Sequence, residues 1–278
     1  MCLYIASLNS GSNGNCYYAG NDTEAVLIDA GISCRETEKR MKRCGLSMKN
    51  VKAIFISHEH SDHISGVTVL SKKYQLPVYI TPATLKSSGL PIEPHLVNAF
   101  TPGEPITINN ISVTAFTKQH DADDPHSFIV ACKAVTVGIF TDVGIVCEEL
   151  VRHFKLCNAA FLEANYDEVM LSTGNYPYHL KKRISGGMGH LSNTQAVALF
   201  NAHRSPGLSH LILAHLSKNN NSPQIVQELF NSYAGNTEII VASRYVQTDV
   251  YQINDSKQAV AGTSKEKGKQ KHLQLSMF

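Results

Sequence analysis

The chain has 278 residues, of which 43% are hydrophobic and 17% are charged, with a formal net charge of +2. This composition is that of an ordinary globular protein, and the charge is too small to indicate nucleic-acid binding by itself. No apolar run is long enough to span a membrane, the N-terminus does not look like a signal peptide, and the seven cysteines are scattered. We therefore expect a cytoplasmic protein with reduced thiols.

Apolar runs bounded by turn residues predict many strands interleaved with fewer helices. Ser192 can cap one helix, and Ser222-Pro223 places proline in the first turn of another. Strands are expected at residues 2–8, 15–19, 24–29, 52–57, 77–80, 111–117, 127–132, 135–141, 158–163, 208–214 and 237–242. Helices are expected at residues 34–45, 65–75, 146–154, 192–204 and 222–234. This order suits two mixed sheets packed face to face with helices outside.

A loop rich in histidine follows the strand expected at residues 52–57. It reads His58-Glu-His60-Ser-Asp62-His63. Neutral imidazole nitrogen and carboxylate oxygen are preferred ligands of zinc-like cations. His58 and His60 face one side of an extended segment, and Asp62 and His63 can face a second cation about 3.5–4 Å away. A surface histidine cluster or a pH-sensing loop is the alternative, but neither needs the strand or the aspartate.

Three further candidate ligands follow apolar runs later in the chain. His120 follows the run at residues 111–119, and Asp142 and His215 follow two later runs. His126 competes with His120, which we prefer because it closes one strand, whereas His126 begins the next. A lone histidine in such a position is more often a core or loop residue, but an ordered set predicts a metal centre.

The spacing H-x-H-x-D-H, with these later residues, resembles the metallo-β-lactamase fold superfamily. The resemblance implies an α+β fold for residues 1–254, a four-layer αββα sandwich with metal ligands on loops at one sheet edge. It implies two divalent cations, Zn²⁺ or Mn²⁺, the first on His58, His60 and His120. The second cation would lie on Asp62, His63 and His215, with Asp142 as the bridge. Asp29 matches the family's acidic strand end and is expected to orient the histidine loop without binding metal.

Two segments between Asp142 and His215 indicate which branch of the superfamily the chain resembles. Leu162-Glu-Ala-Asn-Tyr-Asp-Glu and Gly189-His-Leu-Ser-Asn resemble motifs of nucleases of the tRNA 3′-processing type. In those enzymes an acidic residue holds a histidine that protonates the leaving oxygen, which implies these roles for Glu163 and His190. Asp142 would orient the nucleophile, and Asp62 completes the expected catalytic set.

The chain from about residue 5 to 235 closely resembles the YycJ/WalJ group of bacterial nucleases, most specifically from Asn165 through Asn193. This resemblance implies a 5′→3′ exonuclease on double-stranded DNA with a part in mismatch repair. The phosphate contacts it suggests are Lys181, Arg183, Ser192 and Lys218. The alternative for each basic residue is that it lies on an ordinary solvated surface and contacts no phosphate. The Gly-rich loop at residues 10–15 is either a tight turn or a set of amides near the phosphate.

Residues 255–278 differ in composition from the rest of the chain. They carry several lysines among Gly, Ser and Gln, which predicts a flexible, basic tether. The tether ends in Gln274, Leu275, Met277 and Phe278, which resemble the peptide by which bacterial repair proteins bind the sliding clamp. A chance match, or a tail that folds back onto the body, is the alternative.

Three other functions compete with the exonuclease. An RNA-processing nuclease is one, although the span from Asp142 to His215 is too short for the clamp domain of the larger RNA-processing relatives. A small-molecule hydrolase of thioesters or lactams would not need Glu163 paired with His190. A non-catalytic, clamp-tethered binding module would be expected to lose some of the metal ligands, and all of them are present.

Overall fold

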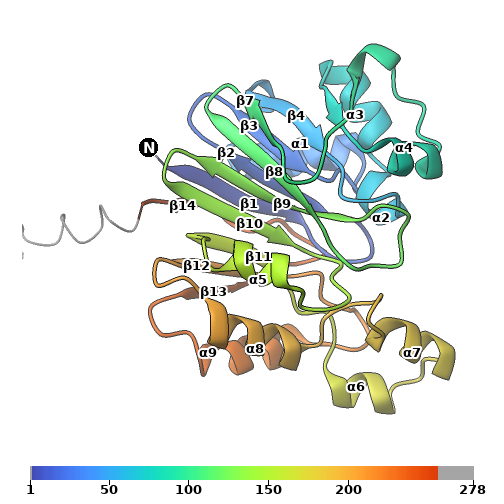
Figure 1. Cartoon of the computed structure of the whole chain (residues 1–278), viewed down its shortest axis with the longest axis vertical. Coiled ribbons are helices and arrows are strands. Elements are labelled where there is room, and N and C mark those ends of the chain that lie inside the picture. Colours follow the sequence, from blue (N-terminus) through green and yellow to red (C-terminus); the bar gives the residue numbers. More distant parts are fainter. Residues whose placement is uncertain (1, 256–278) are drawn as a thin grey trace, which may run out of the picture.

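The computed structural model describes residues 2–255, so the expected clamp-binding peptide lies outside the described residues. Within that range, two seven-stranded mixed sheets pack face to face and helices cover both outer sides (Figure 1). The predicted αββα sandwich is thereby confirmed. No helix in residues 2–255 has the length and apolarity needed to cross a membrane.

The first sheet has the strand order β14-β1-β2-β3-β4-β5-β6. Strands β3 to β6 run parallel to one another, so β3 and β4 end at the same sheet edge. Helices α1 and α3 pack on its outer face. Its strands are β1 Leu3–Asn9, β2 Cys16–Gly20, β3 Ala25–Ile28, β4 Val51–Phe55, β5 Val78–Tyr79, β6 Val97–Asn98 and β14 Tyr251–Ile253. The helices in this half are α1 Cys34–Arg43, α2 Ser61–Ile64, α3 Val67–Tyr74 and α4 Pro82–Ser88, with 3₁₀ helices η1 Met48–Asn50 and η2 Pro94–Leu96.

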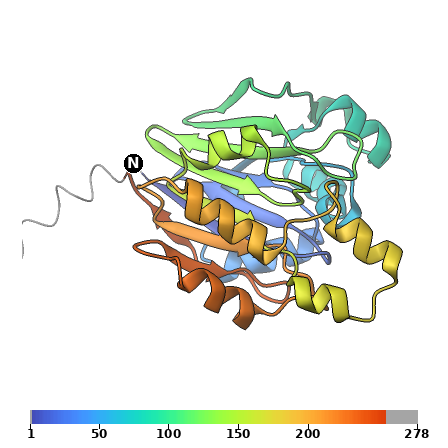
Figure 2. The same cartoon turned by 60° about the horizontal axis from the view of Figure 1, so that its bottom comes forward.

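The second sheet has the order β13-β12-β11-β10-β9-β8-β7, and its strands β10 to β13 are parallel. Helices α5, α8 and α9 pack on its outer face. Helices α6 and α7 project beyond one end of the sheets (Figure 2). The strands are β7 Pro105–Ile108, β8 Ile111–Thr117, β9 His126–Cys132, β10 Val135–Phe140, β11 Ala159–Glu163, β12 His210–Ala214 and β13 Glu238–Val241. The helices are α5 Glu148–Phe154, α6 Glu168–Thr173, α7 Tyr178–Ser185, α8 Asn193–His203 and α9 Pro223–Asn231.

The central core lies between the two sheets and consists of apolar side chains from their facing strands. Tyr17 of the first sheet packs on Phe161 of the second with ring centroids 4.9 Å apart, and Phe55 packs on Phe128 at 5.9 Å. Burial of each such ring contributes about 1.5–3 kcal/mol to the free energy of folding. The sheets therefore form a rigid base from which strand-end loops can hold side chains in place.

Both predicted helix starts are confirmed. Ser192 caps α8 in a capping box with Gln195, and Ser222 caps α9 with Pro223 in its first turn. The predicted strands are found with small shifts of their ends, but the short strands β6, β7 and β14 and the helices α2, α4, α6 and α7 were not predicted. β14 pairs antiparallel with β1 and ends at Ile253, one residue before the expected end of the domain.

Candidate active site

The candidate ligands lie just beyond strand ends of both sheets and meet at one edge of the sandwich. Parallel strands end at a common edge, so segments far apart in the sequence deliver polar side chains to one place. The contributing residues are Asp29 after β3, the histidine loop after β4, His120 after β8, Asp142 after β10, Glu163 at the end of β11 and His215 after β12.

Three of these residues have a left-handed backbone conformation. The φ angles are 60° at Asp29, 54° at Asp142 and 56° at His215. Non-glycine residues adopt this conformation at a cost of order 1–3 kcal/mol, and such residues cluster at functional sites. Each occurs where a central parallel strand ends, and the sharp turn it produces leaves the side chain buried within the cluster.

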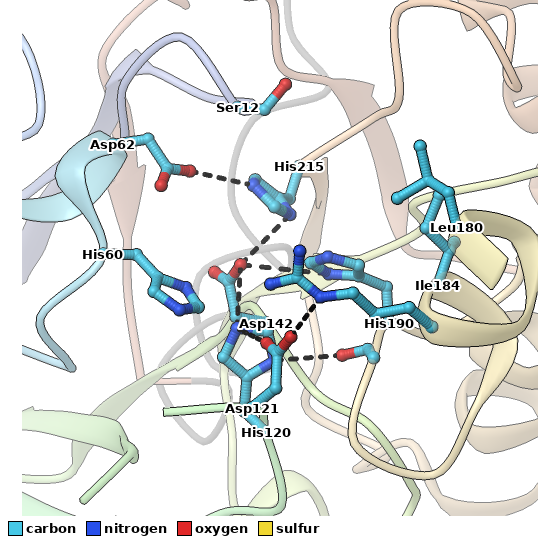
Figure 3. Close-up of a pocket in the computed structure, with 12 residues that line it drawn as sticks. Ser12, His60, Asp62, His120, Asp121, Asp142, Leu180, Ile184, His190 and His215 are labelled. Atoms are coloured by element: carbon cyan, nitrogen blue, oxygen red, sulfur yellow. Dashed lines mark hydrogen bonds and ion pairs between the residues drawn. The ribbon is translucent and has the colours of Figure 1, made fainter. Parts of the chain in front are cut away.

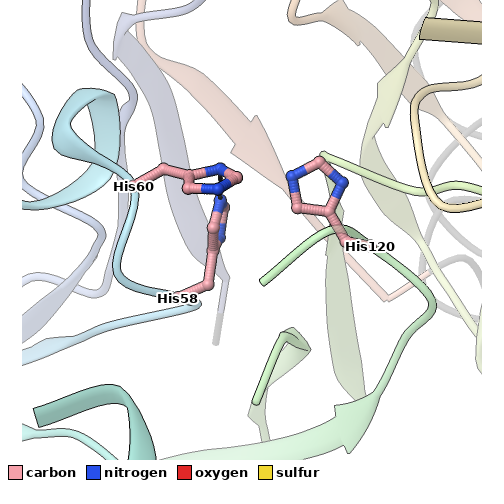
Figure 4. A group of neighbouring side chains, drawn as sticks. All are labelled: His58, His60 and His120. Carbon is pink, nitrogen blue, oxygen red and sulfur yellow. Dashed lines mark hydrogen bonds between the residues drawn. The ribbon is translucent and has the colours of Figure 1, made fainter. Parts of the chain in front are cut away.

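The first group of ligand atoms belongs to His58, His60 and His120, which offer nitrogens within 4.8 Å of one another (Figure 4). His58 Nε2 lies 3.0 Å from His60 Nδ1. His126, the rival of His120, lies elsewhere: its ring packs against Phe100 with centroids 5.2 Å apart. The structure therefore brings the ring of His120, and not that of His126, to the rings of His58 and His60.

The second group consists of Asp62, His63, Asp142 and His215. His63 Nε2 lies 3.2 Å from Asp142 Oδ2, and His215 Nε2 lies 3.5 Å from Asp62 Oδ2. The other oxygen of Asp142 lies 3.9 Å from His120 Nε2 of the first group (Figure 3). Asp142 thus reaches both groups, as a shared ligand would.

Buried polar atoms that make no hydrogen bond indicate that these residues fit a metal. Within residues 2–255, the buried atoms His120 Nε2, His215 Nε2 and Asp142 Oδ2 make no hydrogen bond of good geometry, although charged groups lie 3.2–3.5 Å from each of them. A buried polar atom without a partner costs about 1–3 kcal/mol. All three atoms are of the kinds that bind divalent cations, and they come from both groups. A bound cation would supply the missing partner.

Neighbouring side chains hold the ligands in orientation. Asp29 Oδ2 accepts a hydrogen bond of 2.7 Å from His63 Nδ1, so the other ring nitrogen of His63 faces Asp142. The same carboxylate accepts from the backbone N–H and the hydroxyl of Ser57, both at 2.8 Å. Asn15 donates to Asp62 at 3.1 Å. Such contacts fix ring orientation and raise ligand basicity.

The two groups differ in charge. Burial lowers the pKa of His58 well below its usual value and that of His120 to about 4, so both rings are neutral at pH 7. Burial acts the same way on His215, but Asp142, Asp62 and Glu163 outweigh it and raise its pKa to about 10. The pKa of His63 is also raised, because its carboxylate neighbours outweigh burial.

Glu163 is fully buried and connects two histidines. Its Oε1 accepts from His190 Nδ1 at 2.8 Å and from His215 Nδ1 at 2.9 Å, while Oε2 accepts from the backbone N–H groups of Val143 and Leu191. Burial would raise the pKa of Glu163, but His190 and His215 lower it to about 2. The Glu163 carboxylate is therefore ionised, and it leaves Nε2 of His190 free to act in the pocket.

A pocket opens over both groups and His190 (Figure 3). Ser12 lies at one end, and Leu180 and Ile184 of α7 form a wall across from His60 and Asp62. Arg183 of the same helix forms an ion pair of 2.5 Å with Asp121 at the rim. The projecting helix α7 thus gives the pocket a mixed apolar and cationic side.

Of the other three suggested phosphate contacts, none lines this pocket. Lys181 donates to the Ser172 carbonyl at 2.6 Å, and Ser192 is fully buried, with its hydroxyl capping α8 and donating to Glu168. Lys218 is exposed beside a neighbouring pocket.

Sequence reasoning missed two residues of the site. Lys118 is buried, and its ammonium donates to the Thr141 carbonyl at 2.6 Å, next to Asp142. Buried lysines are rare, so nothing in the pattern pointed to it. Asn15 lies in the Gly-rich loop, for which the sequence suggests either a tight turn or backbone amides near the phosphate; its contact with Asp62 comes from its side chain.

Comparison with known proteins assigns the family. A model described as Beta-lactamase superfamily domain matches residues 24–216. Exodeoxyribonuclease YycJ of Bacillus anthracis is 34% identical over 232 residues, covering 82% of this chain and 87% of the relative. The chain belongs to the YycJ/WalJ group of metallo-β-lactamase-fold hydrolases. Exodeoxyribonuclease WalJ of Streptococcus pneumoniae, of the same group, is 30% identical over 223 residues, covering 78% and 83% of the two chains.

A solved structure agrees on the fold. The metallo-β-lactamase fold protein YhfI from Bacillus subtilis superposes with a TM-score of 0.71 at 15% sequence identity, over 91% of this chain and all of YhfI. Membership of the YycJ/WalJ group, together with the clustered histidines and carboxylates, makes this protein a metal-dependent hydrolase that binds divalent metal.

Proposed function

We propose that the protein is a metal-dependent exonuclease that degrades double-stranded DNA from its 5′ ends, and that it acts in DNA mismatch repair. Two relatives of the same group, which match most of this chain, are named exodeoxyribonucleases. Two cations, Zn²⁺ or Mn²⁺, would occupy the site, one on His58, His60 and His120 and the other on Asp62, His63 and His215, with Asp142 between them.

The observation that carries the proposal is the pairing of His190 with Glu163 next to the candidate metal ligands. The Glu163 carboxylate holds His190 Nδ1 at 2.8 Å. Among the histidines that contact Asp142, His190 is the most exposed, with 21% of its side chain accessible. A phosphodiester needs a proton on its leaving oxygen, and a histidine oriented by a carboxylate can donate one near neutral pH. A hydrolase of lactams or thioesters has no comparable need for this pair.

The remaining residues fit the same reaction. Divalent cations bound here would lower the pKa of water and neutralise charge on the phosphoryl group. The Asp142 carboxylate would orient the attacking water, and His190 would protonate the leaving oxygen from the other side. Arg183 would exchange its surface ion pair with Asp121 for a phosphate of the substrate, an exchange that costs little because exposed ion pairs are weak.

We further propose that the C-terminal residues Gln274, Leu275, Met277 and Phe278 bind the sliding clamp, and that the preceding residues act as a tether. These residues lie outside the described range, so the support is their sequence alone. Deletion of residues 273–278 should abolish retention on immobilised clamp while DNA cleavage is kept. Equal retention of the full chain and the truncated chain would contradict clamp binding.

The seven free thiols fit a reducing compartment such as the cytoplasm.

End-labelled substrates test the nuclease proposal. Metal-loaded protein is incubated with linear duplex DNA labelled at the 5′ or the 3′ end, and with RNA of the same sequence. We expect early release of labelled mononucleotide from the 5′-labelled duplex and slow, progressive shortening of the 3′-labelled one. Faster cleavage of RNA would favour the RNA-processing function. Turnover of a thioester or lactam without cleavage of nucleic acid would contradict a nuclease.

A further inference from the structure

A second pocket lies directly beside the candidate active site. It is a cavity of about 490 Å³, which lies within the range of small-ligand sites. Ser10 and Leu216 form part of its wall, and both adjoin His215: the His215 backbone N–H donates to the Ser10 hydroxyl at 2.8 Å. Ser12, which lies over the candidate active site in Figure 3, accepts from Arg244 of the second pocket at 3.4 Å. Hydrogen bonds from Arg244 to Ser12 and from His215 to Ser10 therefore connect the walls of the two pockets.

The lining of the second pocket is cationic. It includes Arg244 and Lys218 and no acidic residue. Arg244 is half-buried, and its guanidinium donates to the Leu216 carbonyl at 2.9 Å. Among residues 2–255, no carboxylate lies within ion-pair distance of Arg244 or Lys218. A half-buried guanidinium held only by neutral groups keeps its charge uncompensated, and a phosphate oxygen would compensate it.

Further contacts make the pocket rigid. Asn13 donates to the Arg244 carbonyl at 2.9 Å, and the backbone N–H of Ser10 donates to the Ser243 carbonyl at 3.2 Å. The carbonyl of Tyr245 accepts from the buried Arg40 at 3.0 Å. The main chain of residues 243–245 is thus fixed against the loop that borders the candidate active site. A site fixed before its ligand arrives loses little entropy on binding.

Two further features of the rim suit a nucleotide. Tyr245 is 68% exposed although its backbone carbonyl is held by Arg40, so its ring can offer a flat face to a base. Pro223 begins the nine-residue helix α9, whose N-terminal end carries partial positive charge. Both features add to the charges of Arg244 and Lys218.

We propose that this second pocket binds a phosphate of the nucleic-acid strand whose neighbouring linkage is cleaved, with Arg244 and Lys218 on its oxygens and Tyr245 stacked on the adjacent base. The inference rests on the proposed nuclease function and extends it to a named subsite. The phosphate is either the terminal 5′-phosphate or an internal phosphodiester, because both present the same oxygens.

Salt-dependent binding tests the subsite. Affinity of the metal-loaded protein is measured by fluorescence anisotropy on a duplex with hydrolysis-resistant phosphorothioate ends, over a series of salt concentrations. Loss of one phosphate contact reduces the slope of log affinity against log salt by about 0.7–0.9. We expect this reduction, with weaker binding, for Arg244→Gln and for Lys218→Gln. The control is Arg152→Gln, which removes an exposed cation on the outer helix α5 and should leave the slope unchanged.

The choice of variants distinguishes the loss of a phosphate contact from misfolding. Arg244→Gln removes hydrogen bonds to Leu216 and Ser12, but Lys218 is exposed and its side chain makes no hydrogen bond or ion pair within residues 2–255, so Lys218→Gln should fold normally. Tyr245→Ala should weaken binding by about 5- to 150-fold and Tyr245→Phe should not, because a phenyl ring also stacks. A duplex with a 5′-hydroxyl shows which phosphate the pocket binds. If the substitutions weaken binding only of the 5′-phosphorylated duplex, the pocket binds the terminal phosphate. If they weaken binding of both duplexes equally, it binds an internal phosphate.

Two outcomes would overturn the proposal and can be told apart. If the wild type cleaves DNA while Arg244→Gln and Lys218→Gln bind with the wild-type affinity and slope, the subsite is wrong and the nuclease function stands. If the wild type neither binds nor cleaves nucleic acid, the nuclease function fails and the subsite fails with it.

Discussion

The Asp142 carboxylate lies within 4 Å of nitrogens of four histidines, namely His63, His120, His190 and His215. It belongs to the candidate metal centre and also borders the candidate general acid. Its φ of 54° is one that asparagine, like aspartate, adopts readily. Asp142→Asn is therefore a better probe than alanine, since it removes the charge and keeps the backbone conformation.

Substitution of His190 should separate proton donation from metal binding. We expect His190→Gln to lower kcat on DNA by about 10²–10⁴-fold, because a positioned general acid contributes about that much. On bis(p-nitrophenyl) phosphate, whose leaving group needs no proton, the loss should be less than about tenfold. The measurement is kcat on both substrates with metal content monitored. Equal losses on both would argue against His190 as the acid.

Metal binding should release protons at pH 7. The pKa of His215 is raised to about 10 and that of His63 is raised as well, so both rings carry a proton in the metal-free protein and lose it to a cation. Metal affinity should therefore increase with pH across the neutral range. Calorimetric titration in buffers of different ionisation enthalpy measures the release. Heats that do not depend on the buffer would contradict these protonation states.

At the scale of elements, the candidate site depends on close packing between the histidine loop and the turn after β3. An added Cβ at Gly31 would lie 1.7 Å from the Asp62 carbonyl oxygen, so this approach requires glycine. In the same turn, the Gly31 N–H donates to the Asn15 carbonyl at 2.8 Å. The turn after β3, the histidine loop and the Gly-rich loop thus meet at Gly31, which has no side chain.

Gly31→Ala should displace Asp62 and lower metal affinity by about 10–100-fold, the usual effect of disturbing groups that orient ligands. Metal content after dialysis against a competing chelator measures this. Circular dichroism checks that the sheets remain folded, because Gly31 lies outside the strands. Wild-type metal retention in a folded Gly31→Ala variant would show that the loop tolerates the shift.

The sandwich could be predicted because each long strand is an apolar run. The residues that cluster in the structure are those that the resemblance to the superfamily implied, and their role as metal ligands stays a prediction. The sequence did not predict α6 and α7: α7 has eight residues, and only Leu180 and Ile184 repeat at helical spacing in it, which is too few for a periodic signal. Nor could it predict that Ser192 is buried or that Lys181 contacts a carbonyl, since the packing of α6, α7 and α8 determines both.

At the scale of the whole molecule, Glu24 links the two sheets at the opposite end from the candidate site. It precedes β3, whereas Asp29 follows that strand. Its Oε1 accepts from Asn21 at 2.9 Å and from the backbone N–H and side chain of Asn110, in the turn between β7 and β8. These hydrogen bonds, that of Asn21 foremost, lower the pKa of Glu24 to about 2 against the effect of burial.

Glu24→Gln should destabilise the fold by about 1–3 kcal/mol at pH 7, because an amide cannot accept all of these bonds. The folded-state pKa lies below the unfolded value of about 4.3. The ionised carboxylate therefore stabilises the protein above that value and loses its contribution as pH falls toward 2. Urea unfolding of both proteins between pH 3 and 7 measures the difference. A difference independent of pH would contradict the role of the charge.

Metal-dependent cleavage of DNA at this one centre is the claim on which the account depends. The most direct measurement adds Mn²⁺ or Zn²⁺ to metal-free protein and follows nucleotide release from a linear duplex, for the wild type, Asp142→Asn and the control Arg152→Gln. The account predicts no release without metal, release that rises with added metal in the wild type and control, and none in Asp142→Asn. Cleavage that persists in chelator, or in Asp142→Asn at the wild-type rate, would contradict it.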